Sequence, residues 1–291
     1  MRHADKLRQL GLGAQLRKLR EQKGLSTRSV ARSLGVSPAS INRTELGTRC
    51  PGREEVSALC ALFGVVGEEK RELLDRVSET KDNAAWLATD HIPDQVASLM
   101  VLEREAVAIK GVEVSLVPGL VQTGDYARLI LSAALAPGLD LERQVATRLG
   151  RQAILSKPAA PRIDFFLDEA VLWHGLGHPS VVSEQLRQLI SVQRRENVAI
   201  RVLPLGAGPH DAHRGTFTLY ELGDGSPYVF VEAQGFGMFV TEPSAVQPFV
   251  EACKGMEEHA LSPQDSDSMI LAVAERLEDE RAEVVQEHLQ R

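Results

Sequence analysis

The pattern of hydrophobic and polar positions divides the chain near residue 80. Before that point apolar residues recur at helical spacing, and the pattern predicts five short helices. The best-marked pair lies between Leu25 and Gly47. Its first helix ends at Gly35, because glycine readily adopts the left-handed conformation of a helix C-terminus. Its second helix begins at Ser37, whose hydroxyl can cap free amides, and continues into Pro38, which lacks the N–H that a first helical turn leaves unpaired. The segment therefore predicts two helices joined by a tight turn.

Beyond Trp86 the pattern changes to mixed strands and helices. Helices are predicted at residues 94–110, 125–135, 139–155, 180–194, 244–259 and 266–281, and strands at 112–117, 162–167, 198–203, 215–221 and 228–232. The order strand 162–167, helix 180–194 and strand 198–203 predicts a parallel pair with a right-handed crossover. The expected fold class is an N-terminal all-α five-helix bundle followed by a larger mixed α/β domain.

The length of the chain also predicts two domains. A chain of 291 residues is long compared with the roughly 150 residues of a typical domain. We expect the first domain at residues 1–80, a polar and aperiodic linker at 81–85, and the second domain at 86–291. No apolar run reaches the roughly 20 residues of a membrane span, and no apolar signal segment follows the basic N-terminus. We therefore expect a cytoplasmic protein without a membrane partner.

The charge is distributed asymmetrically. Residues 1–53 contain twelve Lys or Arg and three Asp or Glu, a net charge of +9. The whole chain has 33 basic and 40 acidic residues, so the remainder has 21 and 37, a net charge of −16. A basic segment on an acidic body is expected when only that segment contacts phosphate groups. The candidates for such contacts are Arg17, Arg28, Arg32, Arg49 and Arg53.

The second helix of the 25–47 segment has the size and composition of an element that enters a DNA major groove. Ile41 and Thr44 are predicted to face inward, which leaves small or hydrogen-bonding side chains on its outer side and leading end. Such groups suit close approach to base edges and phosphates. The residues predicted to contact double-stranded DNA here are Ser37, Pro38, Ala39, Ser40, Asn42 and Arg43.

The same segment resembles the helix-turn-helix of the phage-repressor-like, or XRE-type, transcriptional regulators. The matching positions, in order and without a gap, are Leu25, Ala31, Gly35, Val36, Ser37, Ile41, Arg43, Glu45 and Gly47. The family usually has Gln where this chain has Thr27, and the resemblance implies a DNA contact from that position. It also implies an ion pair between Arg20 and Glu45 that holds the first helix against the end of the recognition helix.

A second resemblance covers nearly all of the remaining chain. The blocks that carry it are Trp86, the helix with Glu103, and the segments 117–128, 151–155, 185–189, 200–204, 217–222, 228–232 and 260–266. In these blocks the body is similar to the DUF5753 domain of the Scr1-type antitoxin-like regulators of actinobacteria. The resemblance implies a cytoplasmic DNA-binding regulator with a small DUF397-type protein as a binding partner.

Polar clusters in the body do not form an enzyme motif. His174 and His178 are four residues apart, but Gly175, Gly177 and Pro179 interrupt any helix between them, so the two rings lack a shared face. A second ligand-like group consists of His210, Asp211 and His213. No complete G-x-G-x-x-G and no G-x-S-x-G occurs. We therefore expect no catalytic activity, no cofactor and no metal site.

Cys50, Cys60 and Cys253 are expected to be buried thiols.

The body offers a candidate binding face for a partner or ligand. Two aromatic and apolar clusters stand near glycines or turns, where side chains can be exposed or line a cleft, although ordinary core is the alternative interpretation. Their residues are Leu120, Tyr126, Trp173, His174, Phe236, Met238 and Phe239. Together these patterns predict a sequence-specific DNA-binding transcriptional regulator, expected to be a homodimer, whose body binds a signal or partner. Two alternatives remain, an antitoxin-like interaction protein with a DUF397-type partner and a ligand-gated repressor that senses a small-molecule effector.

Overall fold

The computed structural model describes residues 3–78, 86–89, 92–134, 140–174, 176, 178–233 and 236–289. The chain divides into two compact units, one made of residues 1–105 with 232–245 and the other of residues 106–231 with 246–291. The linker predicted at 81–85 lies outside the described residues. Within the described part of the chain, no helix is long and apolar enough to cross a membrane.

The first unit begins with the predicted bundle of five helices. They are α1 (His3–Gln22), α2 (Thr27–Leu34), α3 (Pro38–Glu45), α4 (Arg53–Phe63) and α5 (Gly67–Ser78). Their apolar faces meet in one core, which contains Leu12, Leu16, Val30, Ala31, Ile41, Val56, Leu59, Cys60, Phe63, Val65 and Leu73. The helices α2 to α5 have only 8 to 12 residues and are too short to be stable alone in water, so this shared burial holds the bundle together.

Three further elements belong to the first unit. They are β1 (Trp86–Thr89), α6 (Ile92–Glu105) and β7 (Phe236–Val240). The two strands pair antiparallel, with Trp86 opposite Val240 and Thr89 opposite Gly237. Sequence patterning predicted neither strand, because each is very short and its partner lies about 150 residues away in the chain.

The second unit is built on a mixed sheet. Its strands are β2 (Ala106–Glu113), β3 (Arg162–Asp168), β4 (Val198–Leu203), β5 (Phe217–Leu222) and β6 (Pro227–Ala233), in the spatial order β6-β5-β2-β3-β4. The strands β2, β3 and β4 are parallel, whereas β5 is antiparallel to both β2 and β6. The predicted parallel pair is therefore confirmed as β3 and β4, and the predicted fold class is confirmed with it.

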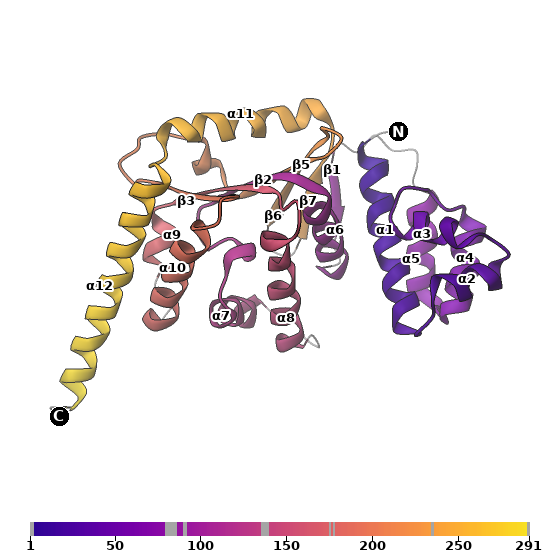
Figure 1. Cartoon of the computed structure of the whole chain (residues 1–291), viewed down its shortest axis with the longest axis horizontal. Helices are drawn as coiled ribbons and strands as arrows, with labels where there is room; N and C mark the ends of the chain where they lie inside the picture. Colours follow the sequence, from indigo (N-terminus) through magenta and orange to yellow (C-terminus); the bar gives the residue numbers. More distant parts are fainter. Residues whose placement is uncertain are drawn as a thin grey trace. The chain divides into compact units, whose positions relative to one another are not determined.

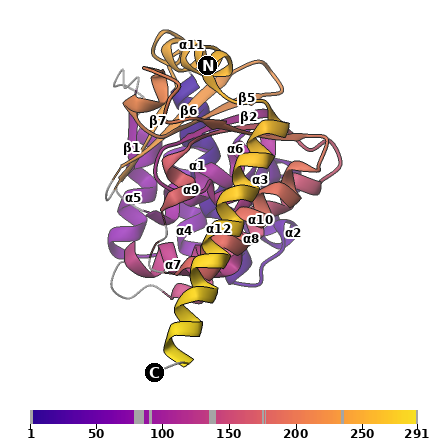
Figure 2. The same cartoon turned by 90° about the vertical axis from the view of Figure 1, so that its left-hand side faces the viewer.

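Helices cover both faces of this sheet. Figures 1 and 2 show α11 (Pro243–His259) across one face and α7 (Gly124–Ala134), α8 (Leu141–Arg151), α9 (Ala170–Trp173) and α10 (Pro179–Gln193) on the other. The long α12 (Pro263–Leu289) packs beside α10 and against β4. Three short 3-10 helices complete the unit, η1 (Gly119–Val121), η2 (Gln152–Ser156) and η3 (Asp211–Arg214).

The predicted boundary between the helix at 94–110 and the strand at 112–117 is wrong. The expected helix at 94–110 ends at Glu105, and the strand expected at 112–117 begins already at Ala106. Ala106, Ala108 and Ile109 are buried in a strand that has a neighbour on each side, β3 and β5. Backbone pairing on both edges of this strand outweighs the local helical pattern.

Candidate nucleic-acid interface

Local capping sets the ends of α2. Ser26 precedes the helix, and its hydroxyl accepts a hydrogen bond from the Ser29 amide at 3.1 Å. At the other end Gly35 adopts φ = 67°, in the left-handed region, and the Val36 amide donates to the Ala31 carbonyl at 3.0 Å. These bonds satisfy backbone groups that a helix terminus otherwise leaves unpaired. The turn between α2 and α3 is therefore fixed by the local sequence.

The start and the orientation of α3 are equally well defined. The Ser37 hydroxyl accepts from the Ser40 amide at 3.1 Å, and Pro38 occupies the first turn. Ile41 and Thr44 are each 1% exposed, so this side of the helix is anchored in the bundle core. The outer side carries the predicted contact residues, of which Ser37, Pro38, Ala39, Asn42 and Arg43 are exposed and Ser40 is half-buried.

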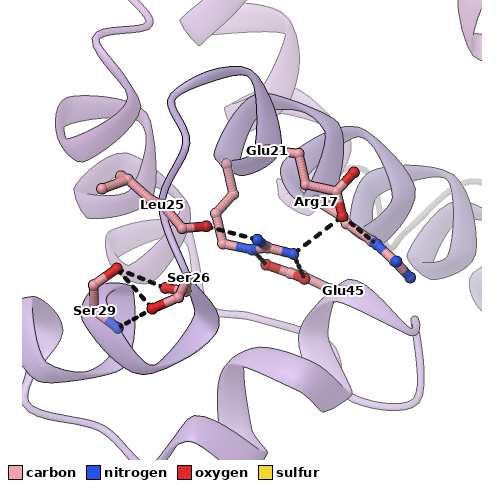
Figure 3. A network of polar contacts seen from close by, with 7 residues as sticks. Arg17, Glu21, Leu25, Ser26, Ser29 and Glu45 are labelled. Atoms are coloured by element: carbon pink, nitrogen blue, oxygen red, sulfur yellow. Dashed lines mark hydrogen bonds and ion pairs between the residues drawn. The ribbon is translucent and has the colours of Figure 1, made fainter.

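A buried ion pair connects α1 to the end of α3. The Arg20 guanidinium donates from Nε to Glu45 Oε1 at 2.6 Å and from Nη2 to Glu45 Oε2 at 2.9 Å (Figure 3). The side chains of Arg20 and Glu45 are only 10% and 5% exposed. Arg20 also donates to the Leu25 carbonyl at 2.7 Å, and the hydrogen bond to Glu45 raises its pKa. One guanidinium thus links α1, the loop before α2 and α3.

Three arginines on α2 and α3 keep their guanidinium groups available. Arg28, Arg32 and Arg43 are exposed, and among the described residues none of their side chains has an ion-pair or hydrogen-bond partner. Thr27 lies at the first position of α2 and is half-buried. An unpaired guanidinium at the surface can donate two parallel hydrogen bonds to a phosphate.

The other predicted phosphate contacts already have partners within the protein. Arg49 donates to Glu55 with both terminal nitrogens, at 2.7 and 2.6 Å, and this pairing raises its pKa. Arg53 donates to the Leu74 carbonyl of α5 at 3.0 Å. Arg17 is exposed and donates to Glu21 at 2.9 Å, so it would have to exchange this partner for a phosphate. Sequence reasoning missed the Arg49–Glu55 pair because it joins the loop before α4 to α4.

A glycine that sequence reasoning overlooked permits the close contact of α1 with α3. A Cβ on Gly13 would lie 2.8 Å from the Glu45 carbonyl oxygen and closer still to the Thr44 carbonyl oxygen. Real Cβ atoms do not approach oxygen so closely, so only glycine fits here without a shift of backbone. Glycine inside a helix lowers the stability of that helix, so the presence of Gly13 within a helical pattern was a signal that this position needs glycine for a close contact.

Three of the seven residues of the candidate binding face are buried. Leu120, Tyr126 and Phe239 are 4%, 1% and 2% exposed, so they belong to the core and not to a surface. The Tyr126 hydroxyl accepts from the Val117 amide at 3.3 Å, and burial raises its pKa. Met238 is half-buried, and the side chain of Phe236 lies outside the described residues. The physical reason is that aromatic and branched residues near a turn fill the space beneath it.

Two of the predicted residues are exposed. Trp173 is 41% exposed, and its indole nitrogen donates to Glu169 at 3.2 Å. The Arg276 guanidinium carbon lies over the Trp173 ring, 5.3 Å from the ring centre. The ring of the exposed His174 contacts the Ser115 carbonyl oxygen through Nδ1 at 2.8 Å.

The thiols also differ from expectation in one case, since Cys60 and Cys253 are buried but Cys50 is exposed.

Comparison with family models assigns both parts of the chain. A model described as a helix-turn-helix domain matches residues 11–74. A model described as a domain of unknown function, DUF5753, matches residues 96–272, more than half of the chain. The chain belongs to the DUF5753 family. No curated protein matches this DUF5753 protein. The helix-turn-helix match coincides with the bundle whose α2 and α3 are described above, and it supports a DNA-binding regulator.

Proposed function

We propose that this DUF5753 protein is a sequence-specific DNA-binding transcriptional regulator that reads base edges with α3. The observation that carries the proposal is the two-sided character of this helix. Ile41 and Thr44 are buried in the core, whereas Asn42 and Arg43 project from the opposite side of a helix with a capped start. Asn and Arg side chains can each bind a base with two hydrogen bonds in the major groove, Asn to adenine and Arg to guanine.

The neighbouring helix supplies groups for the DNA backbone. Arg28 and Arg32 on α2 are exposed without partners among the described residues. Together with Arg43 they concentrate positive charge on the two helices that contact DNA in helix-turn-helix proteins. The net charge of +9 over residues 1–53 attracts DNA to this surface, and the acidic remainder repels it.

Binding to selected DNA tests this proposal. Sites would be selected from a random pool with the full chain, and their affinity measured by fluorescence anisotropy. The double variant Asn42→Ala, Arg43→Ala should lose about 1–3 kcal/mol of binding free energy for each specific contact. Unchanged affinity of the double variant for the selected site would refute the role of α3.

A matched arginine variant separates phosphate contacts from general charge. Arg28→Ala should reduce the slope of log affinity against log salt by about 0.9, the contribution of one phosphate contact. Arg71→Ala removes the same charge from α5, where Arg71 is exposed and lies near Glu68. The Arg71 variant should keep the original slope, and equal slopes for the two variants would contradict a specific phosphate contact by Arg28.

The proposal extends to a homodimer whose body mediates dimerisation and binds a signal or partner. Helix-turn-helix dimers place two recognition helices about 34 Å apart, so a small rotation of the body changes the fit to DNA. The role we propose for the body is binding and not catalysis. Selected sites with two half-sites and a doubled mass in light scattering are the expected results. A monomeric mass at micromolar concentration with single half-sites would overturn this extension.

A further inference from the structure

Three potential metal ligands meet at the carboxyl edge of the second unit's sheet. Asp168 ends β3, and η3 carries His213 and is preceded by His210. One ligand atom from each residue lies within 4.8 Å of those from the other two. The sequence places Asp168 more than forty residues before this histidine pair, so only the fold unites the three side chains.

The position of the cluster follows from the parallel strands. Asp168 at the end of β3 is in register with Leu203 at the end of β4, and η3 follows β4 after a short loop. The carboxyl ends of parallel strands are where open α/β sheets usually bind ligands, because the loops that leave them converge there. We propose that Asp168, His210 and His213 bind one divalent transition-metal ion of the Zn²⁺ class.

The hydrogen bonds around the cluster leave ligand atoms available. Nδ1 of His213 lies 3.1 Å from the His210 carbonyl oxygen and 3.2 Å from the His210 amide nitrogen, so it donates to the carbonyl in one tautomer and accepts from the amide in the other. In the tautomer that donates to the carbonyl, Nε2 of His213 has a free lone pair, as in histidines that bind metals. Asp168 accepts a hydrogen bond from the Ala170 amide at 2.8 Å through Oδ1, which orients the carboxylate and leaves Oδ2 for an ion.

His210 supplies an unsatisfied buried atom. Its amide donates to Nδ1 of His213 at 3.2 Å in one tautomer of His213, and the His213 amide donates to the His210 carbonyl at 3.2 Å. Nδ1 of His210 is buried and has no hydrogen-bond partner among the described residues. A buried polar atom without a partner costs free energy, and coordination of an ion would remove that cost.

The spacing is compatible with Zn²⁺. Bonds of about 2.0–2.1 Å in a tetrahedron put ligand atoms about 3.3 Å apart, and the three ligand atoms here all lie within 4.8 Å of one another. His213 is exposed, and its ring stacks on that of His210 with centres 4.0 Å apart, so it can turn without displacing core residues. The ring centre of His259, at the end of α11, lies 6.2 Å from that of His210. When Nδ1 of His259 donates to the Gly255 carbonyl at 2.9 Å, its Nε2 is left for a fourth position. Two imidazoles with a carboxylate select Zn²⁺ and similar ions over Mg²⁺ or Ca²⁺.

Isothermal titration with Zn²⁺ tests the site directly. The full chain, purified without a polyhistidine tag and freed of metal by chelation, is expected to bind one equivalent and to melt at a higher temperature with Zn²⁺ than with chelator. The variant His213→Asn keeps a side-chain amide near the His210 carbonyl but lacks Nε2, and Asp168→Asn keeps Oδ1 as an acceptor. Each should bind Zn²⁺ at least tenfold more weakly, with an unchanged circular dichroism spectrum.

The control is His178→Asn. His178 is exposed, lies outside the cluster and caps α10 without a side-chain hydrogen bond. This variant should bind Zn²⁺ like the unaltered chain. The proposal is overturned if the unaltered chain takes up no stoichiometric Zn²⁺, if His213→Asn and Asp168→Asn bind as tightly as it does, or if His178→Asn causes the same loss. The readout is independent of DNA binding, so it also stands if the regulator assignment fails.

Discussion

The buried ion pair between Arg20 and Glu45 allows the sharpest test of the DNA-binding bundle. Glu45→Ala removes the carboxylate and leaves the guanidinium, which is 10% exposed, without its main partner. Removal of one member of a buried ion pair costs about 3–5 kcal/mol, since the remaining charge stays desolvated. Arg20 keeps the Leu25 carbonyl and a 3.4 Å contact with Glu21, so we expect a loss of about 3 kcal/mol in the unfolding free energy of the bundle.

The assay must report on the bundle and not on the body. Trp86 lies in β1 of the first unit and Trp173 in the second unit, so intrinsic fluorescence does not isolate the bundle. Urea titration by far-ultraviolet circular dichroism, combined with hydrogen exchange of α1 and α3 amides, isolates the bundle. Glu45→Ala should increase the hydrogen exchange of both helices.

A control and a double variant define what would refute this reasoning. Glu21→Ala removes a carboxylate that is 53% exposed and should cost only about 0.2–1 kcal/mol. Replacement of both charges, Arg20→Met with Glu45→Leu, should restore most of the stability, since no charge remains buried. A loss below about 0.5 kcal/mol in Glu45→Ala, the range of ordinary surface substitutions, would show that the pair does not hold the bundle.

Three further predictions concern packing, capping and thiol reactivity. Gly13→Ala places a Cβ against two carbonyl oxygens of α3 and should destabilise the bundle by about 1–3 kcal/mol in urea titration; an equal or higher midpoint would contradict the close contact. Ser37→Ala removes the hydroxyl that caps α3 and should lower the unfolding free energy by about 1 kcal/mol. Ser37→Asp should retain most of this stability, because its carboxylate can accept the same hydrogen bond. Burial raises the pKa of Cys253 to about 12, so alkylation of the native chain should label the exposed Cys50 first. Mass spectrometry of the labelled peptides checks this order, and early labelling of Cys253 would contradict its burial.

Much of the candidate interface could be predicted because its determinants are local. Gly35, Ser37 and Pro38 act on backbone groups within one helical turn, so their sequence order alone fixes the two helices and the turn. The inward positions of Ile41 and Thr44 follow from helical periodicity. The partners of Arg49 and Arg53 could not be predicted, since a long side chain reaches several neighbours and only packing selects one.

The sequence by itself determined the two-part organisation of this protein, the capped helix pair and the concentration of positive charge around it. Those features depend on composition and on residues within a few positions of one another. The tertiary structure decided that Ala106–Ile109 is strand, that Leu120 and Tyr126 are core, and that Asp168 meets His210 and His213. Each of these outcomes depends on contacts between segments far apart in the chain, where burial and strand pairing outweigh local preference.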